Sequence, residues 1–283
     1  MFPTPIDKTS KTTQMLFHVG LPLALLVWLL PIIAVAFTSV RGGGDLSAGN
    51  YWGLPTEWRI IENYTSVFKN TPLATYILNS FLVTIPTVIG SLVLACMAGF
   101  ALGVYRFRLN MFVFFIFVGG NFVPFQILMV PVRDLSLQLG LYDTITGLAL
   151  FHIAFQSGFC TFFMRNFIRE LPRELIEAAR VEGASEFQIF FKIVLPLVRP
   201  AVAALSVLVF TFIWNDYFWA TVLIQGNHAM PVTGGLKSLN GMWVAQWHLV
   251  SAGSIVAAMP PVLIFFLMQK HFIAGLTFGA TKG

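Results

Sequence analysis

Apolar residues along this chain gather into six long stretches that are separated by short polar segments. Each stretch has at least about the 20 residues that an α-helix needs to cross the ~30 Å hydrocarbon layer of a membrane. The stretches cover about 15–37, 73–105, 110–132, 144–164, 201–224 and 249–268. The pattern therefore predicts an all-α membrane protein, a bundle of six transmembrane helices.

Prolines lie inside four of these stretches. Each proline removes one backbone N–H, and helices in a membrane bundle tolerate this when neighbours or water satisfy the freed carbonyl. We expect interruptions or kinks at these positions, and a break in the third stretch between Pro124 and Pro131. The other prolines inside the apolar stretches are Pro22, Pro31, Pro86, Pro260 and Pro261.

The first stretch resembles a signal peptide, because Lys8 and Lys11 precede it and Ala34-Val35-Ala36 near its end mimics a cleavage site. Its apolar run is longer than the usual 7–15 residues of a cleaved signal. We therefore interpret it as a membrane anchor.

Composition supports the membrane assignment. The chain is 57% hydrophobic and 10% charged, whereas an ordinary soluble domain is roughly 25% charged. The formal net charge of +5 is too small and too scattered to indicate nucleic-acid binding. The two cysteines, Cys96 and Cys160, lie in apolar stretches, and we interpret them as small buried hydrophobic residues rather than a disulfide or a metal pair.

Basic residues set the expected orientation. With a cytoplasmic N-terminus, most of the 17 lysines and arginines fall in inner segments, and the outer loops keep only Arg41, Arg59, Lys69, Arg133 and Lys237. We therefore expect cytoplasmic tails at 1–14 and 269–283, a membrane domain over 15–268, and one long cytoplasmic loop at 165–199.

That loop has the pattern of two short helices joined at a glycine. Pro172 suits the first turn of a helix over 173–180, and Gly183 suits a left-handed stop after it. Ser185 and Gln188 have the spacing of a capping box for a second helix.

We expect this second helix to run from Glu186 to about Leu195 and to be ended by Pro196 and Pro200. Two interpretations follow from the residues alone, a solvated connection between two spans and a docking site for another protein.

The order of residues in this loop resembles a known motif. Glu177, Ala178 and Ala179, then Gly183, then Ile193, Leu195 and Pro196 match the pattern E-A-A-x3-G-x9-I-x-L-P. This is similar to the EAA loop of ATP-binding-cassette (ABC) importer permeases. The resemblance implies that the loop is a coupling helix seated on a separate ATPase subunit, with Glu177 pairing with a basic group and Gly183 fitting the cleft.

A further resemblance covers nearly the whole chain. The run Phe212–Asp216 and the end from Gly275 to Gly283 look like the carbohydrate-uptake permeases, most closely the maltose-type second permease. This implies a bacterial cytoplasmic (inner) membrane, a different permease as partner, a dimer of ATPase subunits that binds ATP and Mg, and an extracytoplasmic sugar-binding protein. It also implies that the C-terminal tail, with Gly279 and Lys282, contacts the ATPase, and that this chain holds no cofactor.

Polar residues within spans are candidates for the substrate pathway. Asp216 is the one acidic residue well inside a span, beside Trp214, Asn215 and Trp219. Hydrogen-bonding groups next to aromatic rings suit a sugar. The alternative interpretation is that Asp216 has a structural role and is held by a neighbouring helix. Weaker candidates, each also interpretable as an interhelical hydrogen bond, are Asn79, Gln126, Asn121, His152 and Gln156. The resemblance implies that the partner permease makes most of the sugar contacts.

Other functions lack their motifs. The sequence has no GxxxxGK[ST] phosphate loop and no HExxH zinc motif, so we expect a transport subunit without an ATPase site of its own. A secondary transporter needs carboxylates at mid-membrane and commonly an internal repeat, and Asp216 alone offers itself. An ABC permease for a non-sugar solute and, behind it, a secondary transporter are the alternatives to a sugar importer.

Overall fold

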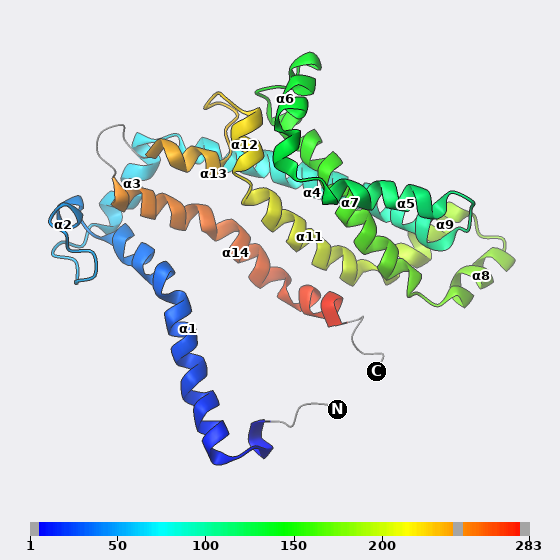
Figure 1. Ribbon diagram of the computed structural model, residues 1–283, viewed down its shortest axis with the longest axis horizontal. Helices are drawn as coiled ribbons and strands as arrows, with labels where there is room; N and C mark the ends of the chain where they lie inside the picture. The colour runs from blue at the N-terminus through cyan, green and yellow to red at the C-terminus, as the bar shows by residue number, and fades with distance from the viewer. Residues whose placement is uncertain (1–5, 240–245, 278–283) are drawn as a thin grey trace. The chain divides into compact units, whose positions relative to one another are not determined.

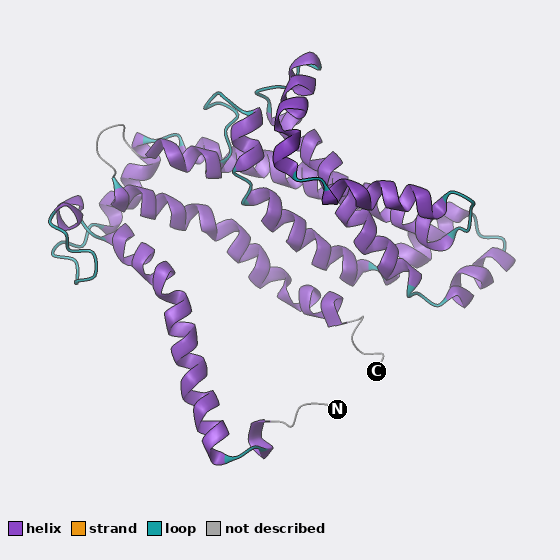
Figure 2. Cartoon of the chain, viewed as in Figure 1, coloured by secondary structure: helices purple, strands orange, loops and turns teal. Residues whose placement is uncertain are grey.

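The computed structural model describes residues 6–239 and 246–277, and within those ranges its regular elements are helices (Figure 2). This confirms the predicted all-α class. The α-helices are α1 (Lys11–Val40), α2 (Gly43–Ser47), α3 (Ile60–Asn70), α4 (Leu73–Val104), α5 (Asn110–Gly119), α6 (Met129–Gln138), α7 (Ile145–Arg169), α8 (Arg173–Val181), α9 (Glu186–Ile189), α10 (Leu195–Leu197), α11 (Arg199–Trp214), α12 (Phe218–Leu223), α13 (Val232–Gly235) and α14 (Trp247–Thr277).

Four of these helices, α1, α4, α7 and α14, are long and apolar enough to cross a membrane. Two bent pairs raise the number to six if each pair is one span. In the first pair, 110–122 meets 125–138 at 91°, and in the second, 186–197 meets 199–214 at 72°. The break at Pro124 agrees with the expectation for the third stretch.

The remaining prolines lie within continuous helices, so they interrupt none of these spans. Pro22 and Pro31 lie inside α1, Pro86 inside α4, and Pro260 and Pro261 inside α14, and none of these helices is divided. A single missing N–H leaves the rest of the helical hydrogen bonds in place, so a long apolar helix continues through the proline.

The fifth stretch is divided where one continuous span was expected. α11 ends at Trp214, and α12 begins at Phe218. The Asp216 carboxylate accepts hydrogen bonds from the backbone N–H groups of Trp219 (3.3 Å) and Ala220 (2.9 Å). A short acceptor side chain that satisfies the first N–H groups of a helix favours a new helix start, and here it interrupts the span.

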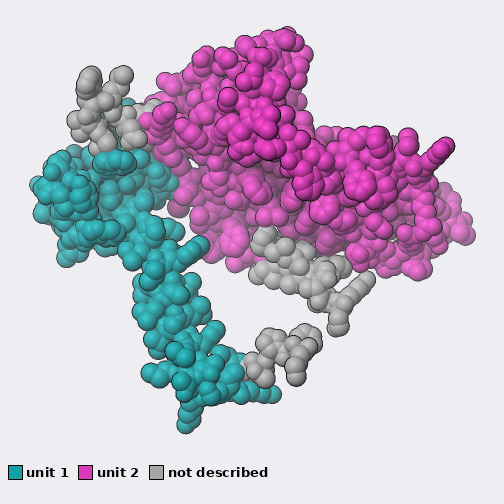
Figure 3. Space-filling model, in the orientation of Figure 1, with its two compact units in different colours: residues 1–71, 239–256 teal, residues 72–238, 257–283 magenta. Residues whose placement is uncertain are grey.

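The chain divides into two compact units (Figure 3), residues 1–71 with 239–256 and residues 72–238 with 257–283. In the second unit, α4 and α7 lie side by side (Figure 1). Gly99 makes the close approach possible, because a Cβ there would lie 3.0 Å from both the Arg165 backbone nitrogen and the Met164 Cβ. α11 completes this core. Cys96 and Cys160 are buried in it as free thiols, as interpreted from the sequence.

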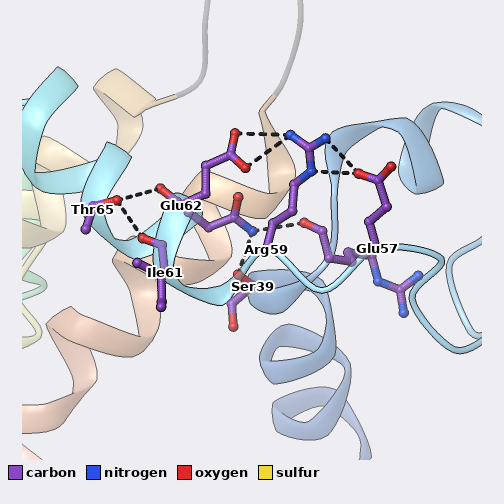
Figure 4. A network of polar contacts seen from close by, with 8 residues as sticks. Ser39, Glu57, Arg59, Ile61, Glu62 and Thr65 are labelled. Atoms are coloured by element: carbon purple, nitrogen blue, oxygen red, sulfur yellow. Dashed lines mark hydrogen bonds and ion pairs between the residues drawn. The ribbon is translucent and has the colours of Figure 1, made fainter.

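The first unit holds α1, whose side chains are nearly all exposed, and a polar network around the start of α3. Arg59 pairs with Glu57 (2.7 Å) and Glu62 (3.1 Å), and the Asn63 amide donates to the Ser39 carbonyl at 2.9 Å (Figure 4). These bonds fix the segment that leads from α1 to α3. The exposed apolar surface of α1 fits a helix that faces lipid or a partner subunit.

In the second unit, Asp143 joins two loops. Its carboxylate accepts the backbone N–H groups of Gln225 and Gly226, each at 2.8 Å, and its own N–H donates to Leu223 at 2.9 Å. Burial acts against the charged form, but the two N–H donors outweigh it and hold the pKa of this carboxyl below its ordinary value. The loop before α7 is thereby fixed to the segment after α12.

Candidate functional site

The loop between α7 and α11 is a helix–turn–helix, as its sequence predicts. Pro172 directly precedes α8 at its N-cap position, and Gly183 has a φ of +81°. The Gly183 N–H donates to Arg180, and the Ala184 N–H donates to Ala179, both at 3.0 Å. These two bonds form a Schellman motif, which needs a left-handed residue at the glycine position.

The second half of the loop begins as predicted and ends differently. Ser185 and Gln188 make both hydrogen bonds of a capping box at the start of α9. The helix then widens into a π-helical segment, Phe190–Val194, and continues as α10. Pro196 therefore does not end the helix. The Leu195 N–H bonds to Phe190 in the wider register, and the chain bends only at Val198, before Arg199.

The EAA residues face two directions. Glu177, Ala178 and Gly183 are exposed, whereas Ala179 is buried and packs inward with Ile176. Ile193, Leu195 and Pro196 are half-buried. The expected outward role thus falls on Glu177, Ala178 and Gly183, while Ala179 holds α8 against the core.

Two large apolar side chains stand out near the turn. Val181 is 89% exposed and Phe187 is 74% exposed. Gly183 between them is uncrowded, because an added Cβ would meet nothing within 4 Å.

A polar clamp ties this loop to α4. The Arg180 guanidinium donates to both oxygens of Glu186, at 2.8 Å and 3.2 Å, which raises the pKa of Arg180. The Tyr105 hydroxyl, directly after α4, donates to the same carboxylate, and the Arg180 guanidinium lies 5.6 Å from the Tyr105 ring centre. Sequence reasoning missed this clamp. Opposite charges on either side of the glycine turn were its only local signal.

A second site lies at the break between α11 and α12. Asp216 lies 3.4 Å from the His152 ring nitrogen Nε2 on α7. Both line a cavity of about 330 Å³, whose other walls are mostly aromatic rings and amide groups, with one isoleucine. These other lining residues are Asn121, Phe125, Phe155, Gln156, Phe159, Phe212, Ile213 and Trp219.

The cavity joins several of the sequence candidates and leaves others apart. Asp216 and Trp219 line it, and so do Asn121, His152 and Gln156, for which interhelical bonding was the favoured interpretation. Their convergence was invisible in sequence because the contributing helices are far apart along the chain.

The other candidates have different surroundings. The Asn79 amide donates to the carbonyls of His228 (2.9 Å) and Met230 (3.0 Å), and the buried Trp214 donates to Ala257 at 2.9 Å. Asn215 is exposed and donates to Thr211, and Gln126 is exposed. Gly279 and Lys282 lie outside the described residues.

Comparisons with known proteins place these features in a context. The family described as binding-protein-dependent transport system inner membrane component matches residues 12–277. The chain is 32% identical over 278 residues to the arabinooligosaccharides transport system permease protein AraQ of Halalkalibacterium halodurans, covering 98% of this chain and 99% of that protein. It is 31% identical over 283 residues to the osmoprotective compounds uptake permease protein GgtD of Synechocystis sp., covering 97% of this chain and 94% of that one.

A solved structure shares the fold. A chain from a bacterial ABC transporter involved in the import of the acidic polysaccharide alginate matches with a TM-score of 0.68. The match covers 94% of this chain and 99% of that one at 18% identity.

Proposed function

The chain belongs to the inner membrane components of binding-protein-dependent transport systems, the permease subunits of ABC importers, and we propose that its cargo is a sugar or an oligosaccharide. Support comes from the arabinooligosaccharide permease AraQ, which matches along nearly its full length. The alternative cargo is a non-sugar solute, because the relative GgtD is named for the uptake of osmoprotective compounds.

The observation that carries the proposed mechanism is the turn at Gly183. The left-handed glycine lets α8 and α9 meet at a narrow exposed tip, beside Glu177 and Ala178. We propose that this tip seats in a cleft of a separate ATPase subunit and that Glu177 pairs with a basic group there. ATP and Mg are then bound by the partner, and this chain transmits the movement of the cleft.

The partner set follows from this role. We propose a heterodimer with a second permease, a pair of ATPase subunits on the cytoplasmic side and an extracytoplasmic binding protein. Both termini are then cytoplasmic, and the C-terminal tail with Gly279 and Lys282 reaches the ATPase.

The cavity at Asp216 is the proposed part of the cargo pathway in this chain. Carboxylate, imidazole and amide groups provide hydrogen bonds to hydroxyls, and Trp219 with its phenylalanine neighbours provides ring surfaces for the apolar faces of a sugar. Asp216 caps α12 and also faces His152, so a ligand there would act on the junction between α11 and α12.

The test is purification of the tagged chain in mild detergent, identification of its partners and reconstitution into liposomes. We expect a second permease and an ATPase with a phosphate-binding loop to co-purify, and we expect oligosaccharide uptake to require both ATP and the binding protein. Uptake by the chain alone without ATP would identify a secondary transporter and refute the proposal. ATP-dependent uptake of a solute that is not a sugar would refute only the cargo assignment.

A further inference from the structure

A hollow lined by five arginines lies where α4, α5 and α7 meet, next to the start of α8. Its volume is about 470 Å³, within the range of small-molecule pockets. We call it the arginine hollow. The arginines are Arg106, Arg108, Arg165, Arg169 and Arg173, and no acidic residue lines it.

These arginines lack carboxylate partners within the described part of the chain. The ion pairs there join Arg59 to Glu57 and Glu62, His152 to Asp216, and Arg180 to Glu186. Arg106, Arg108, Arg169 and Arg173 are exposed, and Arg165 is buried. Like charges gathered around one concave surface repel one another, and the repulsion is weakened by water at the four exposed side chains. The hollow therefore attracts anions.

Arg165 is the one arginine of the hollow that is buried. Its side chain is buried, with 5% of the residue exposed. Nε donates to the Leu102 carbonyl at 3.2 Å, and Nη2 contacts the Met111 sulfur at 3.3 Å.

The guanidinium carbon of Arg165 lies 3.9 Å from the centre of the Phe114 ring. These contacts hold the guanidinium in place but do not neutralise it. A buried charge needs a charged partner, and here the partner must come from outside the described residues.

The neighbouring surface indicates an amphiphile. α5 begins at the hollow and exposes Phe112, Phe115 and Ile116 along its length, and Phe107 is exposed in the segment before it. A phosphate in the hollow and acyl chains along α5 would satisfy both surfaces. Arginine forks match the geometry of phosphate oxygens, and basic pockets between membrane helices are suited to anionic lipid headgroups.

We propose that the arginine hollow binds the phosphate of an anionic phospholipid from the leaflet on the side of the α8–α9 loop. Because Arg173 is the first residue of α8 and also lines the hollow, the bound lipid fixes the base of that loop. This proposal does not depend on the cargo of the importer.

The test is lipid binding by the purified transporter assembly, measured by native mass spectrometry after exchange from zwitterionic nanodiscs into mixtures with phosphatidylglycerol. The hollow variant is Arg106→Gln/Arg169→Gln. The matched control is Lys192→Gln/Arg199→Gln, which removes the same charge from two exposed residues between α9 and the start of α11, outside the hollow.

Each basic residue near an anionic headgroup contributes a factor of about five in affinity, so the hollow variant should retain phosphatidylglycerol about 25-fold more weakly. The control should stay within about twofold of the wild type. Arg106→Lys/Arg169→Lys, which keeps the charge, should recover most of the binding and show that the glutamine variant is not simply misfolded.

Two results would overturn the proposal. Equal losses in the hollow and control variants would mean a diffuse surface charge, and unchanged lipid retention with weaker ATPase association would mean that the hollow is a protein contact. A further arm adds inorganic phosphate to assemblies in phosphatidylcholine nanodiscs, with binding followed by calorimetry. The hollow variant could lose a saturable phosphate binding that the wild type shows, while neither prefers phosphatidylglycerol. That result would mean that the ligand of the hollow is a free anion and not a lipid.

Discussion

Replacement of Gly183 separates backbone strain from bulk at the proposed docking tip. A Cβ at this position meets nothing within 4 Å, so the cost of Gly183→Ala comes from the φ of +81° and not from a clash. A non-glycine residue in the left-handed region costs about 1–2 kcal/mol. Relative to the wild type, the equilibrium constant of the alanine variant should therefore shift toward other turn conformations by about 5- to 30-fold.

The alternative conformations would lose both Schellman hydrogen bonds, Gly183 to Arg180 and Ala184 to Ala179. The helix core would stay folded because the buried cluster of α4, α7 and α11 does not include Gly183. Asparagine tolerates the left-handed region better than alanine does, so Gly183→Asn should lie between alanine and the wild type. Gly183→Trp adds bulk that projects outward and should abolish docking.

The assay is titration of the purified ATPase subunit onto the permease pair in nanodiscs, together with ATP-dependent uptake. Gly140→Ala is the matched control. Gly140 has a φ of +66° in the same kind of turn, with Gly140 bonded to Leu137 and Leu141 to Ser136, and it is equally uncrowded. We expect Gly140→Ala to lower stability by a similar amount and to leave ATPase affinity unchanged. Wild-type ATPase affinity in Gly183→Ala, or an equal loss in Gly140→Ala, would refute the reasoning.

Three further predictions concern single side chains. Glu177→Lys should abolish ATPase association and uptake while changing stability by no more than about 0.5 kcal/mol, because Glu177 is exposed; normal uptake at normal expression would contradict this. Asp216→Ala removes the α12 cap and should lower stability by about 1 kcal/mol and change the uptake kinetics without changing ATPase affinity; wild-type kinetics would return Asp216 to a purely structural role. Asp143→Asn should lower the thermal midpoint, and the difference from the wild type should be constant above pH ~3.9, the ordinary carboxyl pKa. The difference should shrink as the pH falls through the lowered pKa of Asp143, because the wild type then loses its charged carboxylate as well. A difference that grows on acidification would contradict the assigned contacts.

The parts of the fold that the sequence predicts well are those set by short-range backbone chemistry. A capping side chain, a left-handed glycine and the length of an apolar run each act within a few residues, so the turn at Gly183 and the capping box at Ser185 have the predicted form. The break at Pro124 also follows a local rule.

The failures have equally definite causes. Pro196 was expected to end a helix, but the helix continues through it. The segment just before Pro196, Phe190–Val194, has a π-helical hydrogen-bond register. Asp216 was weighed as a residue inside a continuous span, whereas its carboxylate caps a new helix. The cavity partners of Asp216 come from α7 and from the break after α5, and such long-range convergence leaves no trace in local spacing.

One short helix, α11, leads from the bend after the α8–α9 loop to the second candidate site. α11 has 16 residues and is therefore about 24 Å long. At one end, Val194 and Val198 are buried in the core that also holds α8, so a displaced loop carries the start of α11 with it. At the other end, α11 stops one residue before the Asn215–Asp216 junction, and Trp214 is hydrogen-bonded to α14. Movement at the Gly183 tip would thus reach the Asp216 cavity through a rigid helix, and the break after Trp214 is where that movement can change the shape of the pathway.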